Sequence, residues 1–184
     1  MSSDNTRNRF ERAMAAIDRL NAADPRPEVV DGQSRPRELV YAERMTSTLG
    51  ALYPGASQHL QLAARAQHLC RWQIERGTFP MGREGYNAWR SACRAHHAAL
   101  TQDVLRQEGY PEGEIAHVTR LICKQDLKSD RESQALENVV GVVFAAFYLA
   151  PFIAAHPDYA EDKLRGILRK TMRKLDKTDP SYKT

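Results

Sequence analysis

Apolar residues recur along this chain at intervals of three and four, which is the spacing of one face of an α-helix. The strict alternation of apolar and polar residues that marks a strand is almost absent. Prolines, glycines and polar runs divide the pattern into segments of helical length. The predicted helices are Phe10–Leu20, Leu39–Leu52, Ser57–Glu75, Tyr86–Gly109, Pro111–Ile122, Glu132–Ala155 and residues 156–177. The pattern therefore predicts an all-α protein of about seven helices.

The length of 184 residues suits a single compact domain and leaves no room for a second one of ordinary size. Residues 24–37 contain several prolines and Gly32, and we expect them to form a surface loop. Residues 178–184 are expected to be a frayed tail. The whole chain, residues 1–184, is interpreted as one helical domain.

The composition is that of an ordinary soluble protein, with 42% apolar residues, 27% charged residues and a net charge of +4. This mild basic excess permits an anionic partner without requiring one. The three cysteines lack paired spacing and are interpreted as reduced core residues. The segment Val139–Ala155 is uncharged and contains Gly141 and Pro151. We interpret it as the central buried helix of a cytoplasmic domain that has no membrane partner.

Polar residues interrupt the apolar face of the third predicted helix, in the stretch "LQLAARAQHLCRWQ". On an ideal helix, Gln67, His68 and Arg71 lie on the same stripe as Leu60 and the small residues that follow it. Burying a polar group without a partner costs roughly 1–3 kcal/mol. These residues therefore indicate either a polar pocket or a closed network of internal hydrogen bonds.

Other predicted helices repeat this feature. Arg90 and His97 are in register with apolar residues of the fourth helix, and Glu137 enters the uncharged segment of the sixth. Glu43 and Lys124 are further candidates on the second and fifth. In all-helical domains, binding sites are built from side chains on facing helices. We therefore expect these groups to converge on one pocket.

The residue types suggest two roles in such a pocket. His68, His97 and Glu137 could act as general acids and bases or as ligands of a divalent metal. The cationic groups suit a phosphate or a carboxylate, and they are Arg71, Arg90 and Lys124. No established phosphate-binding loop or metal-binding motif occurs in the sequence. The cofactor therefore stays open at this point.

Two further segments could bind nucleic acid. Tyr86 and Trp89 are interleaved with arginines, a pattern that can stack bases, although Trp89 on the helical stripe also suits a plain core position. The last predicted helix carries a basic run that could dock RNA or form an ordinary solvated face. Its basic residues are Arg165, Arg169, Lys170, Arg173, Lys174 and Lys177.

Motifs along almost the whole chain resemble the family called domain of unknown function 4202. They include "ELVYAERMTSTL", "LQLAARAQHLCRW", "FPMGREGYNAWRSACRAHHAAL", "GYPEGEIAHVTRLICKQDLKSDRESQALENVV" and "ILRKTMRKL". The combined string is specific, but this family implies no activity. Function therefore has to be argued from the residues themselves.

More distantly, the same motifs resemble the HD-domain phosphohydrolases, which are all-helical and hold a metal through His and Asp. This resemblance implies an HD-domain-like fold and a site for phosphate esters. The position of the first histidine of that family holds Tyr41, the His-Asp doublet is replaced by Gln67 and His68, and the final aspartate falls at Glu137 or Asn138. An unmodified metal centre is therefore not expected here. A rearranged ligand set of Glu43, His68, His97 and Glu137 remains an alternative.

The leading hypothesis is a helical enzyme that hydrolyses a small phosphorylated compound such as a nucleotide. In it, the pocket is lined by Tyr41, Glu43 and Gln67. The rival hypothesis is a non-catalytic module on a degenerate HD-like fold that binds a nucleotide, RNA or protein. A third reading has the polar groups pair only with one another.

Overall fold

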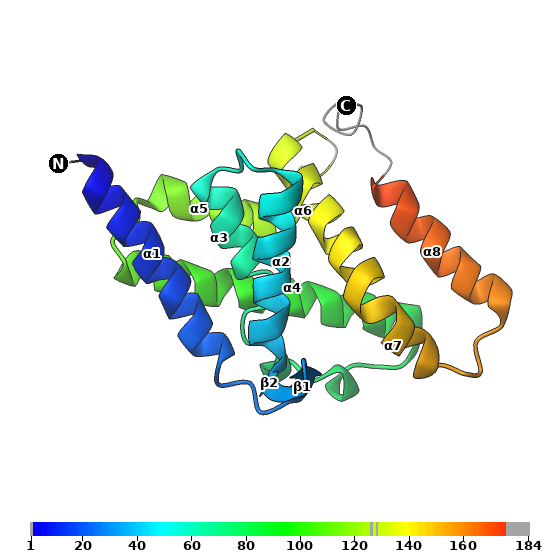
Figure 1. Ribbon diagram of the computed structural model, residues 1–184. Coiled ribbons are helices and arrows are strands. Elements are labelled where there is room, and N and C mark those ends of the chain that lie inside the picture. Colours follow the sequence, from blue (N-terminus) through cyan, green and yellow to red (C-terminus); the bar gives the residue numbers. More distant parts are fainter. Residues whose placement is uncertain (1, 126, 128, 176–184) are drawn as a thin grey trace.

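Helices dominate the computed structural model, which describes residues 2–125, 127 and 129–175 (Figure 1). The α-helices are α1 (Ser2–Asn21), α2 (Arg37–Leu52), α3 (Gln58–Arg65), α4 (Gly82–Gln107), α5 (Glu112–Ile122), α6 (Arg131–Val143), α7 (Leu149–Ala154) and α8 (Glu161–Leu175). The shorter elements are strands β1 (Pro27–Val30) and β2 (Gln33–Pro36), the 3-10 turns η1 (Arg71–Gln73) and η2 (Arg76–Thr78), and the π-helix η3 (Phe144–Tyr148). The all-α class predicted from the pattern is confirmed. The predicted tail, residues 178–184, lies outside the described residues.

Helix α3 lies at the centre of the packing, because it contacts α1, α2, α5 and α6. Its inward residues are small or aliphatic, and Leu62, Ala63 and Ala64 are fully buried. Alanine at two adjacent positions lets the neighbouring helices approach closely. The helix begins at Ser57, whose hydroxyl accepts the backbone N–H of Leu60 at 3.1 Å, as an N-cap does.

The predicted third helix, Ser57–Glu75, is too long by ten residues at its end, since α3 ends at Arg65. The chain then continues through tight turns to Cys70, which has a left-handed φ of 52°. The buried side chain of Asn21 accepts the N–H of Cys70 at 3.1 Å and holds the turn in place. Gln67, His68 and Arg71 therefore do not share a helical stripe, and that part of the prediction is wrong.

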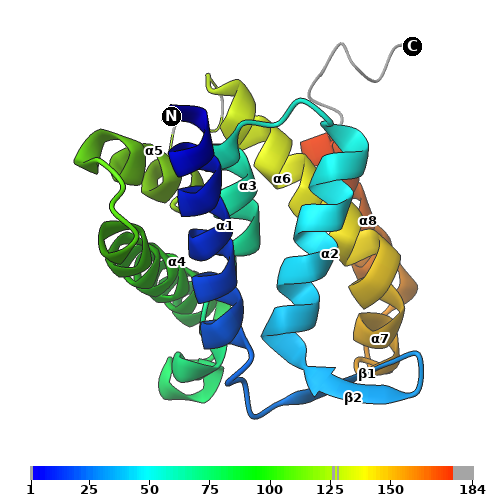
Figure 2. The same cartoon turned by 60° about the vertical axis from the view of Figure 1, so that its left-hand side comes forward.

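A short hairpin occupies the segment that was expected to be an irregular loop, residues 24–37. Strands β1 and β2 pair in antiparallel register, with Val30 opposite Gln33. The connecting Asp31 and Gly32 have φ values of 51° and 77°, which is the conformation that an Asp-Gly turn favours between two strands. Figure 2 shows the hairpin crossing beneath α2 toward α7.

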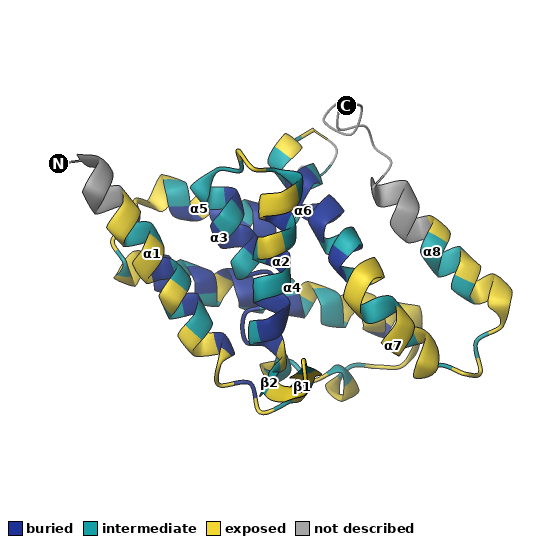
Figure 3. Ribbon diagram, viewed as in Figure 1, coloured by how far each residue is buried: buried dark blue, intermediate teal, exposed yellow. Residues whose placement is uncertain are grey.

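Helices α6 and α7 form one continuous helix through η3, from Arg131 to Ala154. It is long and apolar enough to cross a membrane, and 33% of its most apolar window is buried. The prediction of a central buried helix holds for α6 only. Most of α7 is exposed (Figure 3), with Ile153 showing 37% exposure, because α8 packs against α6 and leaves α7 uncovered. Phe147 of the preceding η3 is 43% exposed.

Two glycines are required by the backbone near the ends of α4. Gly109 has a φ of 78°, and the N–H groups of Gly109 and Tyr110 bond to the carbonyls of Arg106 and Leu105, which closes the helix as predicted. At the other end, the buried Gly85 lies against the Pro80 carbonyl of the preceding loop. A β-carbon at position 85 would stand 1.8 Å from that oxygen, so the close approach requires glycine.

We predict that Gly85→Ala lowers the free energy of unfolding by about 1–3 kcal/mol, because the loop before α4 must move away from the new methyl group. Gly50→Ala is the matched control, since nothing lies within 4 Å of a β-carbon at that exposed position of α2. Removing an unhindered helix glycine stabilises by about 0.5–1 kcal/mol. Urea denaturation measures both changes, and equal effects would contradict the close contact.

Candidate functional site

Charged and aromatic side chains from several elements meet near the start of α2. They come from α2, from the turns that follow α3, from α4, from the end of α5 and from α6. We call this group the His68 cluster, and its members are Glu38, Tyr41, His68, Arg71, Trp89, Arg90, Lys124 and Glu137. Most of the residues that the sequence predicted to converge are therefore close together.

His68 is the centre of the cluster. Its Nε2 lies 2.9 Å from Nη1 of Arg71, and its Nδ1 lies 3.3 Å from Oε2 of Glu38. Its ring stacks on Tyr41 with centroids 3.8 Å apart and planes 9° from parallel. Because a guanidinium can only donate, Nε2 must accept and Nδ1 must carry the hydrogen that faces Glu38. The surroundings of His68 thus select one neutral tautomer.

The electrostatics favour the same neutral form. Burial lowers the pKa of His68 well below its ordinary value of 6.5, and the nearby charges of Arg71, Lys124 and Arg90 lower it further. The side chain still has 24% of its surface exposed. His68 is therefore a neutral imidazole that solvent can reach, with its basic nitrogen covered by Arg71.

Glu38 is held in place by the segment that precedes the hairpin. Arg26 donates to Oε1 of Glu38 at 2.7 Å and makes two bonds of 3.0 Å to Asp24. Asp24 in turn accepts the backbone N–H of Glu38 at 3.0 Å. Burial raises the pKa of Glu38, while the charges of Arg26 and Arg71 act against that rise. The network leaves Oε2 of Glu38 directed at His68.

Arg71 and Arg90 have only weak partners. The Arg71 guanidinium lies 4.6 Å from the centroid of Trp89, whose Nε1 donates to the carbonyl of Ile74 at 2.9 Å. Arg90 lies 5.8 Å from the centroid of Tyr86. Within the described part of the chain, neither guanidinium forms an ion pair with a carboxylate. Two cations near His68 can therefore accept an anion.

Lys124 and Glu137 form an ion pair at the edge of the cluster. Glu137 is 3% exposed, so a cationic partner is needed to keep a carboxylate there. Lys124 directly follows the end of α5 and has a left-handed φ of 57°. This conformation costs a residue with a β-carbon roughly 1–2 kcal/mol. The N–H groups of Lys124 and Gln125 bond to the carbonyls of Leu121 and Arg120, which is how a left-handed residue closes a helix.

His97 is buried beside the cluster, with its ring centroid 5.9 Å from that of His68. Its Nδ1 donates to the Leu69 carbonyl at 2.8 Å, which fixes the turn that carries His68. Burial and the neighbouring His68 lower the pKa of His97 to about 3. Its Nε2 has no hydrogen-bond partner among the described residues. His97 is therefore a neutral ring that holds the turn carrying His68 in place.

Two residues that were predicted to line the pocket, Glu43 and Gln67, are not members of the His68 cluster. Glu43 points to the hairpin, where Arg35 donates to its Oε1 at 2.7 Å. The helical stripe placed it inward, but a position two residues beyond Tyr41 faces another side of α2. Gln67 is buried, and its Oε1 has no donor among the described residues. Neither side chain has a contact with His68 that the structure shows.

The sequence pattern gave no reason to select Glu38, Asp24, Arg26 or Tyr148. Tyr148 belongs to η3, where the π-turn brings its ring within 5.8 Å of Tyr41 and its hydroxyl to Arg44 at 2.9 Å. A π-turn in a long helix often marks a functional position. For Glu38, the available signal was its place in the first turn of a helix, three residues before Tyr41.

The donor atoms do not fit a metal ion. Within the residues that the structure describes, no group of three or more His, Cys, Asp or Glu side chains is placed to bind one. Glu43 bonds to Arg35, Glu137 to Lys124, and His97 to a backbone carbonyl. The rearranged ligand set considered from the sequence is therefore not assembled, and the chemistry proposed for His68 uses no metal ion.

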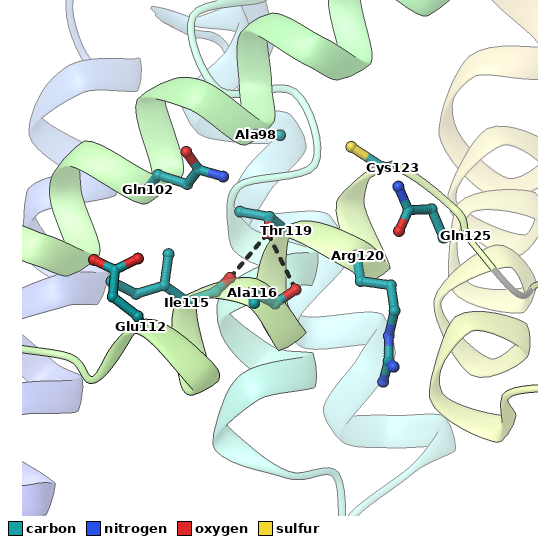
Figure 4. A pocket seen from close by; sticks show the side chains of 9 residues that line it. All are labelled: Ala98, Gln102, Glu112, Ile115, Ala116, Thr119, Arg120, Cys123 and Gln125. Carbon is teal, nitrogen blue, oxygen red and sulfur yellow. Dashed lines mark hydrogen bonds between the residues drawn. The ribbon is translucent and has the colours of Figure 1, made fainter.

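A separate hollow of about 330 Å³ lies between α4 and α5 (Figure 4). Gln102 of α4 and Thr119 of α5 are among the side chains that line it, together with Arg120 and Cys123. The hydroxyl of Thr119 bonds back to carbonyls of its own helix. No member of the His68 cluster lines this hollow, so it is not the pocket that the sequence predicted.

A family model described as a domain of unknown function, DUF4202, matches residues 11–180. The chain belongs to the DUF4202 family. The family resemblance stated from the sequence is thereby confirmed, and the match covers every member of the His68 cluster. No curated protein and no solved structure matches this DUF4202 chain. The more distant resemblance to HD-domain phosphohydrolases stays a prediction.

We predict that stability falls as the pH is lowered below about 6.5, with His97 as one cause. Its native pKa of about 3 lies below the ordinary value of 6.5, so the unfolded chain binds the proton more readily between these values. The unfolding free energy therefore falls toward acid, by up to about 1.4 kcal/mol per pH unit. Above pH 6.5 this contribution is fully present.

The matched variant is His97→Asn, because an asparagine amide can still donate to the Leu69 carbonyl but does not titrate. Urea denaturation of both proteins between pH 4.5 and 7.5 (roughly the window in which these pKa values matter) gives the two slopes. The variant is expected to have the shallower one. Identical slopes would show that His97 does not carry this dependence.

Proposed function

We propose that this protein binds a small phosphorylated compound at the His68 cluster, through Arg71 and Arg90 with Lys124 beside them. One observation carries the proposal: the Arg71 guanidinium faces a neutral ring nitrogen at 2.9 Å and an indole face, and has no carboxylate partner among the described residues. A phosphate oxygen is a far stronger acceptor for a guanidinium than either group.

The remaining charges support an anion at the same place. The charges of Arg71, Lys124 and Arg90 all lower the pKa of His68. Lys124 is paired with Glu137, so Arg71 and Arg90 supply the positive charge that no carboxylate of the described residues balances. The planar fork of an arginine matches two phosphate oxygens at once, which a lysine does not. Arg71 and Arg90 are therefore assigned the direct contacts.

Hydrolysis of the bound compound is the second candidate function, and the Glu38–His68 contact favours it. Once a phosphate engages Arg71, the lone pair of His68 Nε2 is released toward the ligand. A water molecule can then give a proton to Nε2 while its oxygen forms a bond to phosphorus and the ester P–O bond breaks. Glu38, 3.3 Å from Nδ1, stabilises the resulting imidazolium. The leaving oxygen takes a proton from solvent or from Lys124.

The geometry favours His68 for proton transfer over the other two candidates. His97 is 1% exposed and bonds to a backbone carbonyl, and Glu137 is paired with Lys124. Both are better suited to positioning the residues that touch the ligand. Because only His68 of the predicted catalytic set has a partly exposed side chain, and Arg71 covers its basic nitrogen, binding is the primary proposal and hydrolysis the second.

RNA binding by the basic C-terminal helix and a cytoplasmic location stay predictions. In α8, Arg165 pairs with Glu161 at 2.7 Å, and Lys163 lies 3.2 Å from the Tyr159 centroid. The bases from Lys170 onward lie outside the side chains that the structure describes. The three cysteines are free thiols, as is usual in a reducing compartment.

We predict that ribose 5-phosphate stabilises the protein in a thermal-shift titration and that Arg71→Gln weakens its binding by roughly 10–100-fold, the effect of losing charged hydrogen bonds. The matched control is Arg94→Gln, one turn from Arg90, since Arg94 donates to Ser91 and has no contact with His68. A chelator is expected to change nothing. Equal affinities for the two variants would overturn the assignment of Arg71.

Hydrolysis is tested by phosphate release from the same ester. We predict that His68→Gln lowers the rate by at least about 100-fold, as expected for loss of a general base, while binding changes only a few-fold. Glu38→Gln keeps an acceptor near Nδ1 and is expected to retain more activity than His68→Gln. Absence of turnover by the unaltered protein would remove this second candidate and leave binding in place.

A further inference from the structure

We infer that the phosphorylated ligand carries an aromatic ring and that Tyr86 provides the surface on which this ring stacks. The inference rests on the proposed phosphate site and extends it to the rest of the ligand. It starts from the position of Tyr86 on α4. Its side chain is one of the exposed large apolar residues, with 45% exposure.

Tyr86 belongs to a chain of contacts that begins at His68 and passes through Arg71 and Trp89. Arg71 covers the Trp89 ring at 4.6 Å, and the Trp89 and Tyr86 rings are 5.7 Å apart and tilted by 46°. Arg90 lies 5.8 Å from the Tyr86 centroid. The exposed ring therefore lies next to Arg90 and is separated from Arg71 by Trp89, and neither arginine has a carboxylate partner among the described residues.

The two aromatic rings have different freedom to bind a ligand. Trp89 is fixed by the bond from its Nε1 to the Ile74 carbonyl, and Arg71 occupies one of its faces. Tyr86 is the exposed ring of the pair. Aromatic rings of a ligand gain substantially from stacking on such a side chain, and a neighbouring guanidinium adds to the attraction. A phosphate on Arg71 and Arg90 would place the remainder of the ligand beside Tyr86.

This arrangement favours aromatic phosphate esters over sugar phosphates. A sugar phosphate can use both arginines but has no planar face for Tyr86. An aromatic phosphate ester, of which a nucleoside monophosphate is one kind, uses the arginines and the ring together. The structure thus assigns Tyr86 as a specificity-determining residue, with Arg90 linking the phosphate and ring positions.

The test compares adenosine monophosphate with ribose 5-phosphate by isothermal titration calorimetry on the full chain. The pair shares the phosphate and the ribose and differs in the ring. We expect adenosine monophosphate to bind roughly tenfold more tightly, the gain typical of one stacked base. Tyr86→Ala is expected to abolish this difference and to leave ribose 5-phosphate unchanged, while Tyr86→Phe keeps the difference.

The matched control is Phe147→Ala, because Phe147 has a similar exposure of 43% but lies against Arg44, which bonds to Glu28. This variant is expected to bind both probes normally.

A 5′-phosphorylated hexa-adenylate is expected to bind no more tightly than the mononucleotide. Tighter binding would show that the ligand is the end of an RNA strand and not a small compound.

The outcomes separate this inference from the proposal on which it rests. If both probes bind the unaltered protein equally, Tyr86 has no role in recognition, and the phosphate site stands. If neither probe binds, the phosphate site itself is wrong. Loss of the difference in Phe147→Ala as well as in Tyr86→Ala would also overturn the assignment of Tyr86.

Discussion

The contact between Arg71 and His68 determines how the site can work. A guanidinium that bonds to a ring nitrogen keeps the imidazole neutral, because protonation would place two cations face to face. The same contact leaves Arg71 with a neutral partner that an anion can replace. A closed mesh of ion pairs would have used a carboxylate at this place. The bond between Arg71 and His68, in which a cation faces a neutral acceptor, therefore distinguishes the site from a purely structural network of ion pairs.

The rest of the cluster maintains this contact. Glu38 selects the tautomer of His68 that leaves Nε2 available to Arg71, and Asp24 and Arg26 fix Glu38 through the segment that leads into the hairpin. From the other side, His97 bonds to the carbonyl of Leu69, next to His68 in the chain. The imidazole is thus positioned by groups from α2, α4 and the first connecting segment. Buried polar networks of this kind are stable only when their members are satisfied together.

The sequence predicted the members of the site better than their arrangement. His68, Arg71, Arg90 and Lys124 could be found because polar residues in an apolar segment are visible in the pattern itself. Their geometry could not, because the turn at Cys70 depends on Asn21, which lies 49 residues before the N–H that it accepts. A helical stripe assumes that the helix continues, and no local signal showed that it stops at Arg65.

The hairpin and Glu38 are two further features that the sequence pattern alone could not predict. The hairpin had a local signal, since Asp31 and Gly32 are a favoured turn pair, but its strands are too short to show an alternating pattern. Glu38 had only its place in the first turn of a helix, because its role comes from Arg26 and His68, which meet it only in the fold. Sequence periodicity therefore predicts the α-helices and the residue types of the site. Local bonds at Gly109 close α4 as predicted, whereas the turn at Cys70 depends on a tertiary hydrogen bond to Asn21.

The backbone at Cys70 supports the view that the cluster is more than a satisfied core. Among the described residues, Asp31, Cys70 and Lys124 are the non-glycine residues with positive φ, and Asp31 is explained by its turn. Lys124 is explained by the end of α5, where the N–H of Gln125 bonds to the Arg120 carbonyl, whereas Cys70 lies directly before Arg71. Strained residues persist only where the surrounding structure holds them, and they concentrate at functional sites. A leucine at position 68 and a relaxed helix through position 70 would be the simpler solution for stability alone. The chain instead keeps an unusual backbone at Cys70, directly before the arginine that bonds to His68.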